Sequence, residues 1–386
     1  MAVARGKVGS FLEAARSIGP LIRETAGEGN LHRELSKEAA EAIVDGGFFR
    51  MLLPRSLGGY ELEYPEYLKV VQTFAEADGS TGWCVNQNTV LATQAVKLPE
   101  STAREIWSDE RAVLANGPPI HAEVTAVKGG YRLTGSWRFS SGCHHANWMV
   151  ALVPKNKIGA RMRSRSEDDL LLVMPKEQVK LVDVWDVNGL RGTGSFNFEV
   201  EDLFVPEAYT FDWGVLPRED GPLYAMPMTL IFASGFGCVA LGVARAGLDA
   251  AIEIGTGKRA EREGSLLREK ATFQRSIGQA EAKWRSARAF LFESAEGAWE
   301  SVCGSGVLSL DERIKLRLAS THAIRVGAEV TDMAYNLCGS DAIFERNPVQ
   351  RRFQDAHVIT QQIQGRLEHY EKAGQFFLGL EPTGEF

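Results

Sequence analysis

The sequence lacks the marks of several large classes of protein. Its five cysteines form no CxxC pair, which argues against a disulfide framework or a zinc site and indicates reduced thiols in a cytoplasmic protein. Lysine and arginine total 43 against 50 aspartates and glutamates, so the basic surface of a nucleic-acid-binding protein is missing. No cluster has metal-ligand spacing, and no glycine-rich phosphate loop of the Rossmann type is present. We therefore expect neither a metal nor a nucleic-acid partner.

Long hydrophobic runs are absent as well. The most apolar stretch, residues 230–244, contains Gly235, Gly237 and Gly242 and is shorter than the roughly 20 residues that a membrane span needs. This stretch predicts a buried, closely packed helix. The beginning of the chain, Met1 to Pro20, alternates apolar and charged residues, so neither a secretory signal nor membrane association is expected.

The hydrophobic period changes twice along the chain. Helical spacing is typical of residues 1–111, as in Phe11, Ala15, Ile18 and Ile22. Alternating segments separated by turn residues, including a tight turn at Gly129, predict a β-domain over 112–222. Long helical patterns then return over 223–386, and short connections between them predict an antiparallel four-helix bundle. The expected bundle helices lie near 228–255, 265–299, 308–338 and 349–379.

Three motifs carry a resemblance to a known family. Residues 129–142 (GGYRLTGSWRFSSG), residues 189–195 (GLRGTGS) with 202–206 (DLFVP), and residues 53–60 (LPRSLGGY) resemble signatures of the acyl-CoA dehydrogenases, in the same order. The resemblance implies a mainly helical fold with a β-barrel or sandwich middle domain between an N-terminal helical domain and the bundle.

Two departures from the dehydrogenases indicate a different activity. The position of their catalytic carboxylate falls at about Ile363-Gln364, and their substrate loop is replaced by residues 116–122 (NGPPIHA). Proton abstraction from an acyl thioester needs that base. Both losses are shared by the flavin-dependent monooxygenase branch, which includes phenol and indole hydroxylases, dibenzothiophene monooxygenase and amino-sugar N-oxygenases, and residues 135–142 resemble that branch more closely.

The branch implies a two-component oxidoreductase. Reduced FAD or FMN, bound transiently and supplied by a separate NAD(P)H:flavin reductase, would react with O2 to a C4a-(hydro)peroxyflavin that oxygenates a small aromatic or heteroatom-containing substrate. One alternative is an acyl-CoA dehydrogenase with a displaced base such as Glu368. Another is a non-catalytic flavin-fold protein that binds a ligand or partner. The resemblance, together with small residues along 233–244, also implies a homotetramer.

The resemblance assigns candidate residues to the flavin. The segment Phe139-Ser140-Ser141, with Trp137 in the same strand, is expected along the flavin ring, with the Ser141 hydroxyl near N5. The alternative for Ser141 is a capping hydroxyl on a strand turn. Arg259 and Arg275 lie in a region that meets the flavin of a neighbouring subunit in the family, and a solvated helix face is the alternative.

The remaining candidates belong to catalysis and to the substrate pocket. Ser141, His357 and His121 are the catalytic candidates, while Trp83, His144, Gln361 and Gln362 are assigned to the pocket. Many members of the branch carry a histidine where this chain has Gln361 or Gln362, so His357 is the proposed substitute. A core tryptophan or histidine, or a surface histidine, is the alternative in each case.

Overall fold

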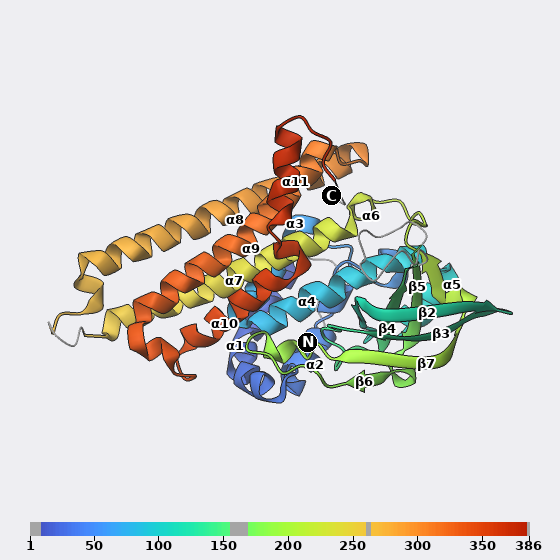
Figure 1. Ribbon diagram of the computed structural model, residues 1–386, viewed down its shortest axis with the longest axis horizontal. Coiled ribbons are helices and arrows are strands. Elements are labelled where there is room, and N and C mark those ends of the chain that lie inside the picture. Colours follow the sequence, from blue (N-terminus) through green and yellow to red (C-terminus); the bar gives the residue numbers. More distant parts are fainter. Residues whose placement is uncertain (1–8, 155–168, 260–263, 384–386) are drawn as a thin grey trace.

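The computed structural model describes residues 9–154, 169–259 and 264–383. Figure 1 shows long helices at one end of the molecule and the strands at the other, with α4 between them. The predicted order of helices, β-region and helices is confirmed. The N-terminal helices are α1 (Gly9–His32), α2 (Lys37–Asp45), α3 (Tyr64–Ala77), α4 (Gly79–Ala92) and α5 (Glu100–Trp107).

The middle region contains two four-stranded sheets. Their orders are β1-β4-β5-β8 and β2-β3-β7-β6, and β1 pairs with β4 in parallel whereas the other pairs are antiparallel. Gly129, at φ 81°, makes the predicted turn between β2 and β3. The strands are β1 (Leu114–Gly117), β2 (Pro119–Val127), β3 (Gly130–Trp137), β4 (Trp148–Val153), β5 (Leu170–Pro175), β6 (Lys180–Val182), β7 (Asn197–Pro206) and β8 (Thr210–Asp212).

The last predicted helix is interrupted, which corrects the expectation of one helix over 349–379. Gln362 has an extended backbone, and its side chain accepts a hydrogen bond from the Gln364 amide. The helical path therefore stops for a short 3-10 turn before it resumes. The C-terminal helices are α6 (Pro222–Ala225), α7 (Met228–Gly257), α8 (Ala271–Ser305), α9 (Leu310–Cys338), α10 (Pro348–Gln361) and α11 (Glu368–Phe377).

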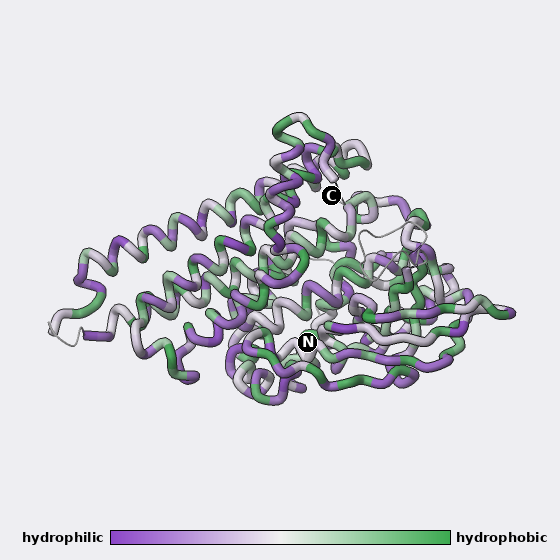
Figure 2. The backbone as a smooth tube through the Cα atoms, viewed as in Figure 1, coloured by the Kyte–Doolittle hydropathy of each residue, from purple (hydrophilic) through white to green (hydrophobic). Residues whose placement is uncertain are grey.

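Helix α7 forms the centre of the helical part and packs against α3, α4, α9 and α10. It is long and apolar enough to cross a membrane, but 89% of its most apolar window is buried inside the fold, as in the core helix predicted for this stretch. Figure 2 shows α8 alternating between hydrophilic and hydrophobic residues, the pattern of a helix with one face in solvent.

Candidate active site

The segment that follows β3 has an unusual backbone. Phe139 has a φ of 59°, and its side chain is 51% exposed, whereas Ser140 and Ser141 are buried. The Ser140 amide donates to the Phe196 carbonyl at 3.0 Å, which fixes the segment beside the start of β7. A left-handed conformation at a bulky residue costs free energy and is common at functional sites. This segment is therefore the centre of the candidate site.

A chain of buried hydroxyl groups begins at Ser141. Its Oγ lies 2.7 Å from the Ser195 Oγ, which lies 2.7 Å from the Thr193 Oγ1. Thr193 donates to the Leu190 carbonyl at 2.8 Å. At the other end, the Trp83 indole N–H donates to the Ser141 Oγ at 3.0 Å. The chain thus connects α4, the segment after β3 and the loop before β7.

The far end of this chain is fixed by Asp355 on α10. The Leu190 amide donates to the Asp355 Oδ1 at 2.6 Å, and Leu190 itself has a φ of 51°. Burial, together with the nearby Asp78 carboxylate, raises the pKa of Asp355 to about 6, although the Leu190 amide and the guanidinium groups of Arg351 and Arg352 oppose this rise. Asp355 therefore holds the Leu190 peptide at some cost in desolvation.

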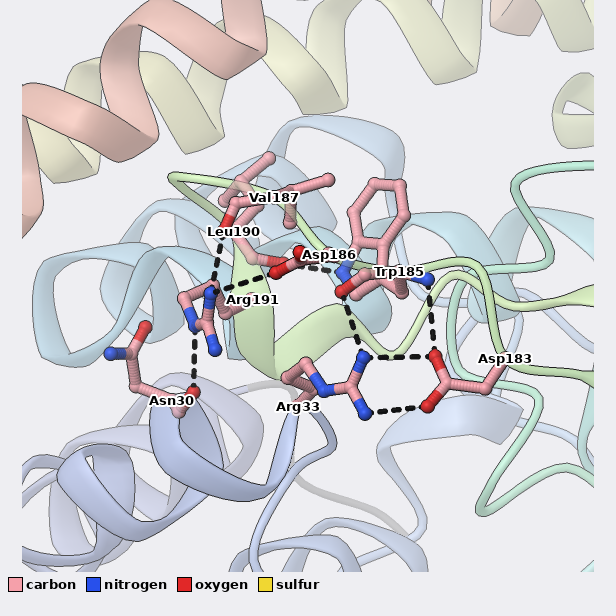
Figure 3. A network of polar contacts seen from close by, with 8 residues as sticks. All are labelled: Asn30, Arg33, Asp183, Trp185, Asp186, Val187, Leu190 and Arg191. Carbon is pink, nitrogen blue, oxygen red and sulfur yellow. Dashed lines mark hydrogen bonds and ion pairs between the residues drawn. The ribbon is translucent and has the colours of Figure 1, made fainter.

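The loop from Asp183 to Arg191 is also tied to the end of α1, as Figure 3 shows. Arg33 faces Asp183, with Nη1 donating to Oδ1 at 2.9 Å. Arg191 donates from Nε to the Asn30 carbonyl at 3.0 Å and from Nη1 to the Val187 carbonyl at 2.7 Å. The Arg33 guanidinium and the Asp183 carboxylate form a two-point contact, which restricts their orientation more than a single contact does. These contacts fix the loop that carries Leu190 and leads directly into Thr193.

Helices α4 and α7 border the hydroxyl chain with two aromatic side chains, Trp83 and Phe236, and one polar side chain, Asn88. The Trp83 ring packs on Phe236 of α7 with centroids 4.1 Å apart. Asn88 donates to the Ser141 carbonyl at 3.2 Å, and its Oδ1 lies 3.1 Å from the His145 Nε2. Burial lowers the pKa of His145 to about 3, so the ring is neutral at neutral pH. These contacts give the backbone of Ser141 a second anchor.

We expect substitution Asp355→Asn to flatten the pH dependence of stability. The folded pKa of about 6 exceeds the ordinary aspartate pKa of 3.8, so Asp355 favours folding below the lower value, and this contribution is lost as pH rises through the upper one. The loss amounts to ~3 kcal/mol. Urea unfolding of wild type and variant at about pH 4 and about pH 7.5 measures the difference.

Asp249→Asn, at an exposed carboxylate paired with Arg245, is the control, and it should change both stabilities little. Equal pH dependence in wild type and Asp355→Asn would contradict the raised pKa of Asp355.

The predicted catalytic histidines lie apart from the hydroxyl chain. His357 is on α10, where its Nε2 contacts the Asp332 Oδ1 at 2.8 Å and its ring packs on Phe353. It is two residues from Asp355, so the two side chains leave α10 on nearly opposite faces. His121 is exposed on β2. The structure does not bring either histidine to Ser141 within one chain, and their catalytic roles stay predictions.

The predicted pocket residues are divided between several places. Trp83 lies at the hydroxyl chain, as described. His144 turns towards the end of α1, where its Nδ1 contacts the Glu34 carboxylate at 2.9 Å. Gln361 is exposed, and Gln362 caps the turn after α10. Of these four, Trp83 hydrogen-bonds to Ser141, and the substrate contacts of all four remain predictions.

The other predicted cofactor ligands have different surroundings. Trp137 has no exposed surface, stacks on Phe198 with centroids 4.8 Å apart, and donates to the Leu152 carbonyl at 2.9 Å. This position indicates that it supports the strand from inside. Arg259 and Arg275 are exposed; Arg259 follows the end of α7 and Arg275 lies near the start of α8, and Figure 1 shows these helix ends away from the sheets. Their predicted contact with a flavin requires a neighbouring subunit.

Sequence reasoning missed three residues of the site. Ser195 and Thr193 stood in the motif at 189–195 without an assigned role, and Asp355 served only as a landmark for the missing base. The sequence did hold a hint of Thr193 and Ser195, because the motif at 189–195 places two hydroxyl residues just before a predicted strand. Their partners could not be read from it.

The residues around Ser141 fit a flavin ring. Phe139 offers an exposed aromatic surface. The Ser140 Oγ is buried and has no hydrogen-bond partner among residues 9–154, 169–259 and 264–383. A buried polar atom without a partner costs free energy unless a ligand satisfies it. The segment thus presents an aromatic face and unsatisfied hydrogen-bonding capacity to a planar, polar-edged group.

Comparisons with known proteins define the class of fold. Residues 5–105 match the family described as acyl-CoA dehydrogenase, N-terminal domain, and residues 234–365 match acyl-CoA dehydrogenase, C-terminal domain. The structure is similar to that of a 3-HSA hydroxylase from a Rhodococcus species, with a TM-score of 0.87, 26% identity and 98% of both chains covered. The helical and strand regions therefore form an acyl-CoA dehydrogenase-type fold.

Two relatives narrow the class. Indole-3-acetate monooxygenase of Pseudomonas putida is 34% identical over 93% of this chain and 91% of its own. A flavin-dependent monooxygenase, oxygenase subunit HsaA, of Rhodococcus jostii is 28% identical over 95% of this chain and 96% of its own. The chain belongs to the flavin-dependent monooxygenases of the acyl-CoA dehydrogenase family.

Proposed function

We propose that this protein oxygenates a small aromatic substrate, using O2 and a reduced flavin that a separate NAD(P)H:flavin reductase supplies. The observation that carries the proposal is the buried hydroxyl chain ending at Ser141, beside the exposed ring of Phe139. The likeness to indole-3-acetate monooxygenase supports an indole-type substrate, so indole-3-acetate is the first compound to test. Reduced FAD or FMN, when bound, supplies the electrons that activate O2.

The protein's own residues then have three tasks. Ser141 would hold the N5 edge of a bound flavin, and Phe139 would border its ring. Trp83 and Phe236 form an apolar wall that excludes water from the reacting face, which protects a reactive oxygen species from wasteful loss. None of these tasks uses a carboxylate base.

The dehydrogenase alternative depends on Glu368, and the structure gives it little support. The Glu368 carboxylate contacts the Lys372 Nζ at 3.5 Å, one turn along α11, and its side chain is 45% exposed. A base that removes an α-proton must face the bound substrate within hydrogen-bond reach. Glu368 instead forms an ordinary surface ion pair.

The test mixes the protein anaerobically with reduced FAD or FMN and then admits O2 and indole-3-acetate. The proposal expects a transient absorbance distinct from both reduced and oxidised flavin, followed by an oxygenated product. Bleaching of oxidised flavin by an acyl-CoA would support the dehydrogenase alternative. Absence of both signals, with correctly folded protein, would support a non-catalytic binding protein and contradict the proposal.

We propose further that the protein is a cytoplasmic homotetramer built from three units at 1–111, 112–222 and 223–386. The small residues of α7 do not supply the subunit contact, because they are buried within the chain: Ala233, Gly235, Gly237, Ala240, Gly242 and Ala244. Exposed apolar residues near the C-terminus are better candidates, namely Ile363, Leu367, Phe377, Leu378 and Leu380.

We expect light scattering at micromolar concentration to give the mass of four chains. Leu378, 79% exposed, is the test position, because a charge there would be desolvated in an apolar interface. Leu378→Asp should therefore lower the mass, whereas Leu31→Asp, at a 71% exposed leucine of α1, should not. A monomeric wild-type protein would contradict the tetramer.

A further inference from the structure

The hydroxyl chain at Ser141 has a single direction. A hydroxyl group owns one hydrogen, an indole N–H only donates, and a carbonyl oxygen only accepts. Because the Thr193 hydrogen is used on the Leu190 carbonyl, the contact between Thr193 and Ser195 requires the Ser195 hydrogen. The contact between Ser195 and Ser141 then requires the Ser141 hydrogen.

The other end of the chain agrees with this direction. The Trp83 N–H donates to the Ser141 Oγ, so every bond from Trp83 to Leu190 points the same way. Hydrogen bonds aligned head to tail polarise one another and strengthen the chain. All members are buried, with Ser195 and Thr193 each 2% exposed, so water does not compete for these bonds. The hydrogen bond from the Leu190 N–H group to Asp355 holds Leu190, and with it the Leu190 carbonyl that ends the hydroxyl chain, in place.

The direction decides what Ser141 offers to a ligand. Its hydrogen is committed to Ser195, and one of its two lone pairs is used by Trp83, which leaves one lone pair. N5 of an oxidised flavin has no hydrogen and needs a donor, whereas N5 of a reduced flavin carries a hydrogen and needs an acceptor. Ser141 therefore matches the reduced form.

We propose that Ser195 and Thr193 determine the redox specificity of the site, because they make Ser141 an acceptor and so favour reduced over oxidised flavin. This inference rests on the proposed function, which places a flavin at Ser141. It gives the site a means to take up the reduced cofactor from the reductase and to release the oxidised cofactor after turnover. Ser195 and Thr193 act through Ser141 and are positioning residues.

The test measures the dissociation constants of reduced and oxidised flavin separately, the reduced form under anaerobic conditions. In Ser195→Ala the Ser141 hydrogen becomes free to donate to oxidised N5, while its lone pair still accepts from reduced N5. The ratio of the oxidised to the reduced constant should fall about fivefold, the equivalent of one neutral hydrogen bond. The midpoint potential of the bound flavin should fall by about 20 mV accordingly.

Thr193→Val, which removes the next hydroxyl, should shift the ratio in the same direction and serves if Ser195→Ala fails to fold. Ser195→Thr keeps a hydroxyl and should retain the wild-type ratio. Ser294→Ala on α8 is the matched control, because it removes a buried hydroxyl that donates to a helix carbonyl at 2.7 Å, and it should leave the ratio unchanged.

Different results would contradict flavin binding at the site and the direction of the hydroxyl chain. If neither form of the flavin binds the wild-type protein, the proposed function fails. If reduced flavin binds but folded Ser195→Ala and Thr193→Val both keep the wild-type ratio, the directed chain is wrong while the proposed function stands. A ratio that rises in these variants would mean that the chain runs in the opposite direction.

Discussion

Ser141→Ala is expected to increase the rate of hydrogen peroxide release about tenfold relative to wild type. With a reduced flavin bound, the Ser141 Oγ would accept a hydrogen bond from the N5–H group, and holding that proton would slow the wasteful release of hydrogen peroxide. Removing a hydrogen bond of ~1.4 kcal/mol raises the rate of the unproductive step by about a factor of ten. The measurement is the rate of hydrogen peroxide formation after the protein, loaded anaerobically with reduced flavin, is mixed with O2 in the absence of substrate.

Ser141→Ala should also lower the free energy of unfolding, which a substitution at an exposed position would not. Ser141 is buried, and its loss leaves the Trp83 N–H without its acceptor. An unsatisfied buried donor costs ~1–3 kcal/mol. Ser141→Thr keeps the hydroxyl and should restore low peroxide release. Unchanged peroxide release in a folded Ser141→Ala protein would show that the segment after β3 does not contact the flavin.

Gly117→Ala should destabilise the protein by about 3 kcal/mol and weaken flavin binding at the same time. Gly117 ends β1, and a Cβ atom there would overlap the Arg138 carbonyl oxygen and come within 3.0 Å of the Ser140 Oγ. Because the overlapping oxygen belongs to the backbone, the overlap can be removed only if the segment around Phe139 moves. Overpacking of this kind typically costs ~1–3 kcal/mol or more.

Gly278→Ala is the matched control, because a Cβ atom there meets nothing within 4 Å and the position lies inside α8. Alanine in a helix interior is favoured over glycine by up to about 1 kcal/mol, so this variant should be at least as stable as wild type. The comparison uses denaturant unfolding together with the dissociation constant of reduced flavin. Wild-type values of both in Gly117→Ala would contradict the close packing of β1 against residues 138–140.

Local patterns predicted much of the fold. Strand β3 and the turn at Gly129 follow from alternation and from glycine at a positive φ. The short strands β1 and β8 were not predicted, because three or four residues are too few to show a period. The break after α10 was also missed, because it depends on the extended backbone of Gln362 and the cap that its side chain provides.

The candidate site was predicted unevenly for a related reason. The family resemblance located Ser141 and Trp83, and the structure shows them in contact. The helical register could not show that His357 leaves α10 on the face that meets Asp332 instead of the face that carries Asp355. That choice depends on how α10 packs against its neighbours.

By itself, the sequence determined the order of helical and strand regions, the family resemblance and the segment from Phe139 to Ser141. These depend on short-range period, turn chemistry and contiguous motifs, which are written along the chain. Only the tertiary structure decided that Ser195, 54 residues away, meets Ser141, and that Asp355, 165 residues away, holds Leu190. Contacts between distant segments depend on the relative placement of packed elements, and a hydroxyl gains its direction as donor or acceptor only from the partners that this placement brings to it.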